Sequence, residues 1–320
     1  MKYLTTLLNI QYPIIQGGMG NISSAQLTAA ISDAGGLGTI GCGTLSVEEV
    51  AEKIKAVKEM TTKPFAVNIP LTVTEDVIGM MKLVIKEQVP IVSLSAGNPT
   101  PYVAKLHEAG IKVIVVVASV KHAIKAERVG ADILVAEGFE AAGINSSLEL
   151  TTFTLIPQIV KAVNVPVVAA GGIGDGRGLA AAMMLGASGC QMGTRFIATE
   201  EAPFHENYKK KIIQGDDLST MILGRPHGKV RRVINVPYAQ TVLAEQENDS
   251  VEQYLAKTSE TQHVLGAIEG DFENGFINGG QIVGLINTIP TVRELIFEMM
   301  SEVERQIKQV SEGLNGITQK

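Results

Sequence analysis

The chain has 320 residues, of which 33 are glycine, 45% are apolar and only 4% are aromatic. The glycines follow no G-X-Y period and lie within apolar sequence, which excludes a collagen-like fibre and a flexible linker. The net charge of −6 argues against nucleic acid as a partner, and no apolar run reaches the ~18 residues of a membrane span.

Eight short apolar runs alternate with helical patterns along the first two thirds of the chain. They are rich in β-branched residues and apolar on both faces, which is typical of buried parallel strands. The predicted strands are Pro13–Gln16, Leu37–Gly41, Phe65–Ile69, Ile91–Leu94, Lys112–Val117, Ala131–Ala136, Pro166–Ala170 and Gly189–Gly193. Eight strand–helix units favour an α/β fold of the TIM (β/α)8 barrel type over an open doubly wound sheet.

The intervening segments predict helices, and the final third of the chain predicts a different architecture. The barrel helices are expected at Ser46–Met60, Thr74–Gln88, Pro99–Ala109, Ser119–Val129, Thr152–Ala162 and Gly176–Leu185. More polar sequence with irregular periodicity follows the last strand, so we expect a helical cap subdomain over the barrel mouth. The predicted domains are a TIM barrel over 1–214, the cap over 215–290, and a C-terminal helical segment over 291–320 that returns to the barrel.

Barrel enzymes build their active sites from the loops that follow the strands, so the strand ends were compared in order. Gln16-Gly17-Gly18-Met19 follows the first strand, where two glycines let backbone approach a ligand closely. A tight turn with a buried methionine is the alternative. Asn68 lies in an otherwise apolar run, and its amide must be satisfied either by a heteroaromatic ring or by neighbouring backbone.

The ends of the sixth, seventh and eighth strands carry the most specific pattern. Glu137 ends the sixth strand, where a carboxylate either binds hydroxyl groups of a ribityl chain or forms a structural ion pair. Gly171-Gly172 and Gly193-Thr194 follow the seventh and eighth strands. Barrels commonly bind phosphate there, on free backbone N–H groups. We therefore predict a phosphate site, with close glycine packing against helices as the alternative.

Five motifs in this order resemble the nitronate monooxygenase (2-nitropropane dioxygenase) family, close to the FMN-dependent enoyl-ACP reductase branch. The motifs are 16–19, 67–68, 137–143, 170–176 and 192–196. The resemblance implies a TIM barrel that holds FMN. The cofactor-binding residues it implies are Gln16, Gly17, Gly18, Met19, Asn68, Glu137, Gly138, Ala170, Gly171, Gly172, Gln191, Gly193 and Thr194.

One position departs from the family pattern. Both relatives usually carry a histidine directly after the glycine pair that follows the sixth strand, whereas this chain has Ile144. Isoleucine cannot transfer protons, and loss of a general acid–base typically costs ~10²–10⁴-fold in rate. The catalytic residue is therefore left open, with His227, Asn145 and Ser146 as candidates. His263 is interpreted as a solvated helix residue, and His122 as a surface residue of a barrel helix.

The resulting functional hypothesis is an oxidoreductase that oxidises alkyl nitronates with O2. One alternative is an enoyl-ACP (ene) reductase with NAD(P)H as electron donor, and the other is a flavin-binding protein without turnover. No cluster with metal-ligand spacing is present, so no metal is expected. Two cysteines cannot form a disulfide framework and favour a cytoplasmic protein. The expected partners are a small-molecule substrate and a second copy in a homodimer, with no nucleic acid or membrane.

Overall fold

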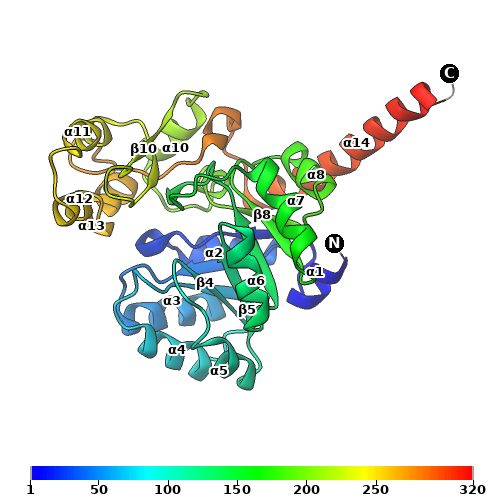
Figure 1. Cartoon of the computed structure of the whole chain (residues 1–320), viewed down its shortest axis with the longest axis horizontal. Coiled ribbons are helices and arrows are strands. Elements are labelled where there is room, and N and C mark those ends of the chain that lie inside the picture. Colours follow the sequence, from blue (N-terminus) through cyan, green and yellow to red (C-terminus); the bar gives the residue numbers. More distant parts are fainter. Residues whose placement is uncertain (1, 319–320) are drawn as a thin grey trace.

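The computed structural model describes residues 2–318, and its centre is a barrel of eight parallel strands, as the sequence predicts (Figure 1). The sheet order is β1-β9-β8-β6-β5-β4-β3-β2, and a parallel bridge between Ile15 and Leu37 joins its two ends. The strands are β1 (Ile14–Gln16), β2 (Gly38–Gly41), β3 (Phe65–Pro70), β4 (Ile91–Ser95), β5 (Lys112–Val117), β6 (Ile133–Glu137), β8 (Val167–Ala170) and β9 (Gly189–Met192).

Helices surround the barrel and return the chain to the start of each next strand. They are α2 (Ala25–Asp33), α3 (Val47–Met60), α4 (Val77–Lys86), α5 (Val103–Glu108), α6 (Val120–Arg128), α7 (Thr152–Ala162) and α8 (Gly176–Met184). Local capping explains several of their starts. Ser46 forms a capping box with Glu49, and Asp175 accepts a hydrogen bond from Gly178 N at the start of α8.

An N-terminal helix, α1 (Lys2–Leu8), which is not among the helices expected from the sequence, closes one end of the barrel. Leu4 and Leu8 are buried and pack in the barrel interior with Ile15 and Leu37. A seven-residue helix is marginal by itself and is stabilised by this burial. Apolar residues therefore fill the end of the barrel that α1 closes, and the open space lies at the opposite end, where the strands finish.

The cap over that end contains a sheet as well as the expected helices. Strands β10 (Thr220–Leu223), β11 (Arg231–Ile234) and β7 (Gly143–Ile144) pair antiparallel in that order. The other elements that follow or cover the strand ends are η1 (Gly20–Ile22), α9 (Thr194–Ile197), α10 (Glu206–Ile213), α11 (Pro237–Glu245), α12 (Val251–Lys257), α13 (Glu260–Val264), η2 (Leu265–Glu269) and η3 (Gln281–Leu285). Because β7 comes from the loop after β6, the sheet joins barrel and cap into one structure.

The last helix, α14 (Val292–Thr318), fills nearly all of the predicted helical segment 291–320. Its first half packs against α8, and its second half extends away from the body of the molecule (Figure 1). The final two residues of the predicted segment 291–320 lie outside the described residues. No helix within the described residues is long and apolar enough to cross a membrane.

Candidate active site

A cavity of about 680 Å³ lies at the carboxyl ends of the barrel strands, between the strand-end loops and the cap. Its volume is within the range typical of small-molecule and cofactor sites. Residues from β3, β4, β5, β6, β8 and β9 and from the loop after β1 line the barrel side, and residues of the cap line the other side. The sequence places the candidate site at this same end of the barrel.

The loops after β1 and β3 form one wall of the cavity. Gly17, Gly18, Met19 and Asn68 all line it, as predicted, whereas Gln16 is fully buried beneath them and accepts a hydrogen bond from Thr39 N. A Cβ atom at Gly18 would lie 2.4 Å from Asn68 Oδ1, so only glycine lets the two segments approach this closely.

The amide of Asn68 is oriented by the neighbouring strand. Asn68 Nδ2 donates to the main-chain oxygen of Ser93 at 3.2 Å and to Ser95 Oγ at 3.1 Å. Among the described residues, no group donates to Asn68 Oδ1. The carbonyl oxygen at the cavity wall is thus available to accept a hydrogen bond from a ring N–H.

The loops after β8 and β9 bring the predicted phosphate-binding glycines together at the cavity. Gly171 and Gly172 have φ values of +95° and +74°, a left-handed conformation that favours glycine. Within the described part of the chain, the N–H groups of Gly172, Gly193 and Thr194 have no acceptor. A Cβ atom at Gly193 would meet nothing within 4 Å, so this side of the cavity is open next to free donors.

Glu137 ends β6 and lines the cavity. Burial raises the pKa of Glu137 to about 7. Its side chain has no hydrogen-bond partner among the described residues, so the structural ion pair considered as an alternative is not formed there. Of the remaining predicted cofactor residues, Ala170 and Gln191 line the cavity, whereas Gly138 lies behind it against Thr152.

Three of the four positions considered for catalysis lie at the cavity. Ile144, Asn145 and Ser146 line its rim, and Ile144 is 49% exposed. Asn145 Nδ2 donates to the main-chain oxygen of Ala141 at 2.8 Å, which fixes the loop after β6. The side chains of Asn145 and Ser146 offer hydrogen bonds, but neither is a general base at neutral pH, and Ile144 offers no polar group.

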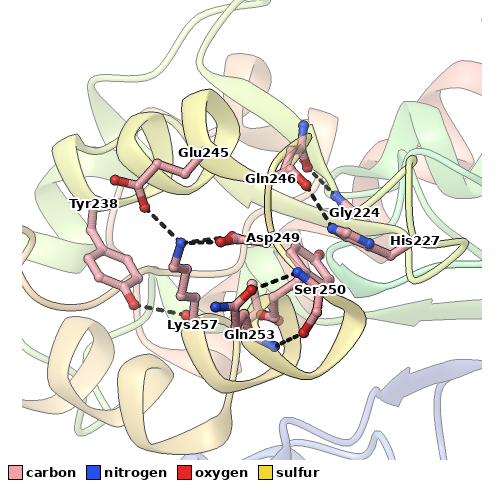
Figure 2. A network of polar contacts seen from close by, with 11 residues as sticks. Gly224, His227, Tyr238, Glu245, Gln246, Asp249, Ser250, Gln253 and Lys257 are labelled. Carbon is pink, nitrogen blue, oxygen red and sulfur yellow. Dashed lines mark hydrogen bonds and ion pairs between the residues drawn. The ribbon is translucent and has the colours of Figure 1, made fainter.

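His227 is not among the residues that line the cavity. Figure 2 shows His227 Nε2 directed at the main-chain oxygen of Gln246, at 2.9 Å. Its ring also stacks on Tyr254 with 4.9 Å between centroids. In the same network, Lys257 Nζ lies 2.7 Å from the carboxylates of Glu245 and Asp249 (Figure 2). In this arrangement His227 holds the packing of α11 and α12.

The prediction for His263 was wrong, because the residue is 2% exposed and lines the cavity. Its ring stacks on Phe276 at 5.3 Å with an interplanar angle of 12°. The sequence places His263 on a short polar helix, which alone indicates exposure. Only the fold of 265–280 back over α13 buries it. His122, by contrast, is exposed at the cavity rim beside Lys125.

The cap also brings charged groups to the cavity that sequence reasoning did not select. Arg231, Glu260 and Asn278 line it together with His263. Glu260 Oε2 lies 3.7 Å from His263 Nδ1 and accepts a hydrogen bond from Asn21 N at 3.2 Å. The sequence held one indication of this pair: a Glu three residues before a His, a spacing that places both side chains on one helix face.

The environment of Glu260 strongly favours its charged form. Burial raises the pKa of Glu260, but the hydrogen bond and charge of His263, the charge of Arg231 and the N–H of Asn21 together lower it to about 2. The barrel is therefore joined to the cap by a buried carboxylate at the edge of the cavity.

An eight-stranded β/α barrel with a cavity at its strand ends, backbone N–H groups without acceptors after β8 and β9, and a polar cap is typical of barrel enzymes that bind small molecules at this end. The family model described as nitronate monooxygenase matches residues 1–77 and 71–302. The chain belongs to this family, whose members are FMN-dependent oxidoreductases.

Individual relatives cover nearly the whole chain. The structure of FabK from Thermotoga maritima, an FMN-dependent enoyl-ACP reductase, has a TM-score of 0.91 and 40% identity, covering 97% of this chain and 98% of that one. A probable nitronate monooxygenase of Staphylococcus saprophyticus is 38% identical over 72% of this chain and 78% of its own. A 5-hydroxy-7a-methyl-1-oxo-octahydro-1H-indene-4-carboxyl-CoA dehydrogenase of Rhodococcus jostii is 31% identical over 95% and 96%.

Proposed function

We propose that this protein is an FMN-dependent oxidoreductase that oxidises alkyl nitronates with O2. The observation that carries the proposal is the match of the nitronate monooxygenase family to residues 1–302 of a chain whose strand ends form an open cavity. The identity of Ile144 narrows the substrate further. A nitronate is already an anion and needs no base to form it, whereas a neutral nitroalkane must first lose a proton.

The cavity residues suit FMN, and three observations support this. The free N–H groups of Gly172, Gly193 and Thr194 would bind the phosphate, since backbone donors beside open space are typical phosphate ligands. The unpartnered carboxyl of Glu137 would accept hydrogen bonds from the ribityl hydroxyls. Asn68 Oδ1 would accept from the isoalloxazine ring, with Gly17, Gly18 and Met19 along its side.

When bound, FMN would supply the redox chemistry, accepting electrons from the substrate and passing them to O2. The protein would supply position and exclusion of water. The Asn68 amide is held by β4 before any ligand arrives, so little ordering is required on binding. The cap would restrict water at the reacting end of the cavity.

Oxygen uptake tests this proposal. Purified protein loaded with FMN is mixed with propionate 3-nitronate or ethyl nitronate, and uptake is compared with free FMN at the same concentration and with neutral nitroethane. We expect uptake well above free FMN with the nitronates and much slower uptake with nitroethane. Uptake equal to free FMN with every nitronate would rule the proposal out.

A second candidate is an NAD(P)H-dependent enoyl-ACP reductase, which the 40% identity with FabK over 97% of the chain favours. The test is anaerobic. NADH or NADPH is added to the loaded protein, the loss of flavin absorbance is followed, and crotonyl thioester is then added. Bleaching followed by reoxidation supports the reductase, and a flavin that neither nucleotide reduces excludes it.

Two further expectations accompany the proposal. Both cysteines are buried and free within the described chain, which supports a reducing, cytoplasmic location. A homodimer is expected from the sequence and is tested by the mass of the purified protein in solution, with a monomer at all concentrations as the contrary result.

A further inference from the structure

Arg231 is a buried cation on the cap side of the cavity. It begins β11, the central strand of the cap sheet, and stands directly opposite Ile144 of β7 in the antiparallel register. Directly opposed residues on antiparallel strands project to the same face, and both side chains line the cavity. Arg231 is only 8% exposed. The cap sheet thus brings one guanidinium to the space above the strand ends.

The guanidinium is held in position on two sides. Arg231 Nη1 donates to Asn278 Oδ1 at 3.3 Å, and Arg231 Cζ lies 5.0 Å from the ring centroid of Phe276. The Asn278 amide is itself fixed, because its Nδ2 lies 3.1 Å from His263 Nε2. The His263–Asn278 pair therefore orients Arg231 without supplying a negative charge.

No carboxylate neutralises Arg231 at close range within residues 2–318. Its nearest acidic group, Glu260, is engaged by His263 and by the N–H of Asn21, and forms no ion pair with Arg231. Burial lowers the pKa of Arg231 and the charge of Glu260 raises it, and a guanidinium stays protonated in proteins. Apart from Nη1, the guanidinium donors have no acceptor in the described structure. A buried cation with free donors facing a cavity favours an anionic ligand.

We propose that Arg231 binds the paired oxygen atoms of a planar anion, the nitronate or carboxylate group of the substrate. A guanidinium presents two parallel N–H donors that match two coplanar oxygen atoms, a geometry shared by nitronates and carboxylates. The proposal rests on the proposed function in taking the cavity as the substrate site. It assigns substrate binding to a residue of the cap that the sequence did not indicate.

Propionate is the probe, because it has the shape and charge of ethyl nitronate and is not oxidised. It is titrated into the FMN-loaded protein while the visible flavin spectrum and the heat of binding are recorded, with propionamide as the neutral isostere. We expect propionate to bind at least ~10-fold more tightly than propionamide. If the wild-type protein binds propionate and propionamide with equal affinity, the proposal is overturned before any variant is made.

The variants then identify the residue. Arg231→Gln should weaken propionate binding by about 10- to 100-fold. Arg231→Lys should weaken it less, because lysine keeps the positive charge but lacks the two parallel N–H donors. Arg225→Gln is the matched control, because Arg225 pairs with Glu149 on the cap surface outside the cavity lining. Unchanged propionate affinity in Arg231→Gln with full FMN content would refute the assignment.

The outcome separates this inference from the proposed function. If no nitronate is oxidised but propionate binding still depends on Arg231, the anion site stands and the proposed reaction fails. If nitronates are oxidised and Arg231→Gln leaves both the KM and the propionate affinity unchanged, the reaction stands and the anion site fails. If Arg231→Gln loses FMN, two other measurements decide whether the anion site stands. They are propionate binding by Arg231→Lys and the propionate–propionamide comparison in the wild-type protein.

Discussion

Glu137 provides the sharpest test of the cofactor site, because its carboxyl group is buried at the end of β6 without a partner. We expect Glu137→Gln to stabilise the flavin-free protein at alkaline pH and to weaken FMN binding. Glutamine keeps the size and the hydrogen-bonding ability of the side chain while removing the charge. The flavin-free protein tolerates the charge poorly, whereas ribityl hydroxyls would donate to it.

The magnitude follows from the pKa. Burial raises the pKa of Glu137 from 4.5 to about 7 in the folded state. At high pH this shift lowers the free energy of unfolding of the flavin-free protein by about 3 kcal/mol at most. Below pH 4.5 both states are protonated and the carboxyl costs nothing. Between pH 4.5 and about 7 only the unfolded state ionises, so stability falls as pH rises. Because the side chain is partly accessible from the cavity, we expect a cost of about 1–3 kcal/mol above pH 7.

The assay is urea unfolding of flavin-free wild-type and Glu137→Gln protein at pH 4.5 and pH 8. The difference in free energy of unfolding should be near zero at pH 4.5 and about 1–3 kcal/mol in favour of the variant at pH 8. Glu304→Gln on the exposed side of α14 is the control. A stability difference that does not change with pH, or a variant that binds FMN as tightly as wild type at pH 8, would refute the reasoning.

Three further predictions follow from other parts of the site. Gly193→Ala should leave the stability of flavin-free protein unchanged within ~0.5 kcal/mol, because its Cβ meets no atom, but should weaken FMN binding about 10-fold; equal affinity by fluorescence titration would contradict the phosphate site. Glu260→Gln should cost about 2–3 kcal/mol at pH 7, since the pKa of Glu260 is lowered to about 2. This stabilisation is complete above pH 4.5 and is lost as pH falls through 2, so thermal unfolding at pH 7 and pH 3 should show a smaller difference at pH 3. Ile144→His should raise kcat/KM for neutral nitroethane by ~10²-fold with little change for ethyl nitronate, because only the neutral substrate must lose a proton. An equal change for both substrates would show that the histidine does not act by proton abstraction.

The sequence alone was sufficient for the barrel and for most of its mouth. The eight strands were predictable because each is a short, continuous apolar run, and local composition records burial on both faces. The glycines at the ends of β8 and β9 stand out in the sequence because a left-handed backbone, as at Gly171 and Gly172, favours glycine. Barrel topology then places every strand end at one rim, so residues distant in the chain could be assigned to one site.

Only the tertiary structure decided what covers that rim. Strand β7 has two residues and exists through its pairing with β11, which brings Arg231 opposite Ile144. His263 belongs to a polar helix by its local pattern, yet the return of the chain at Phe276 buries it. Local sequence records propensity and periodicity, whereas these contacts depend on long-range pairing. The sequence therefore determined the barrel and the glycines at its strand ends, whereas the charged residues of the cap reach the cavity only through long-range contacts of the folded chain.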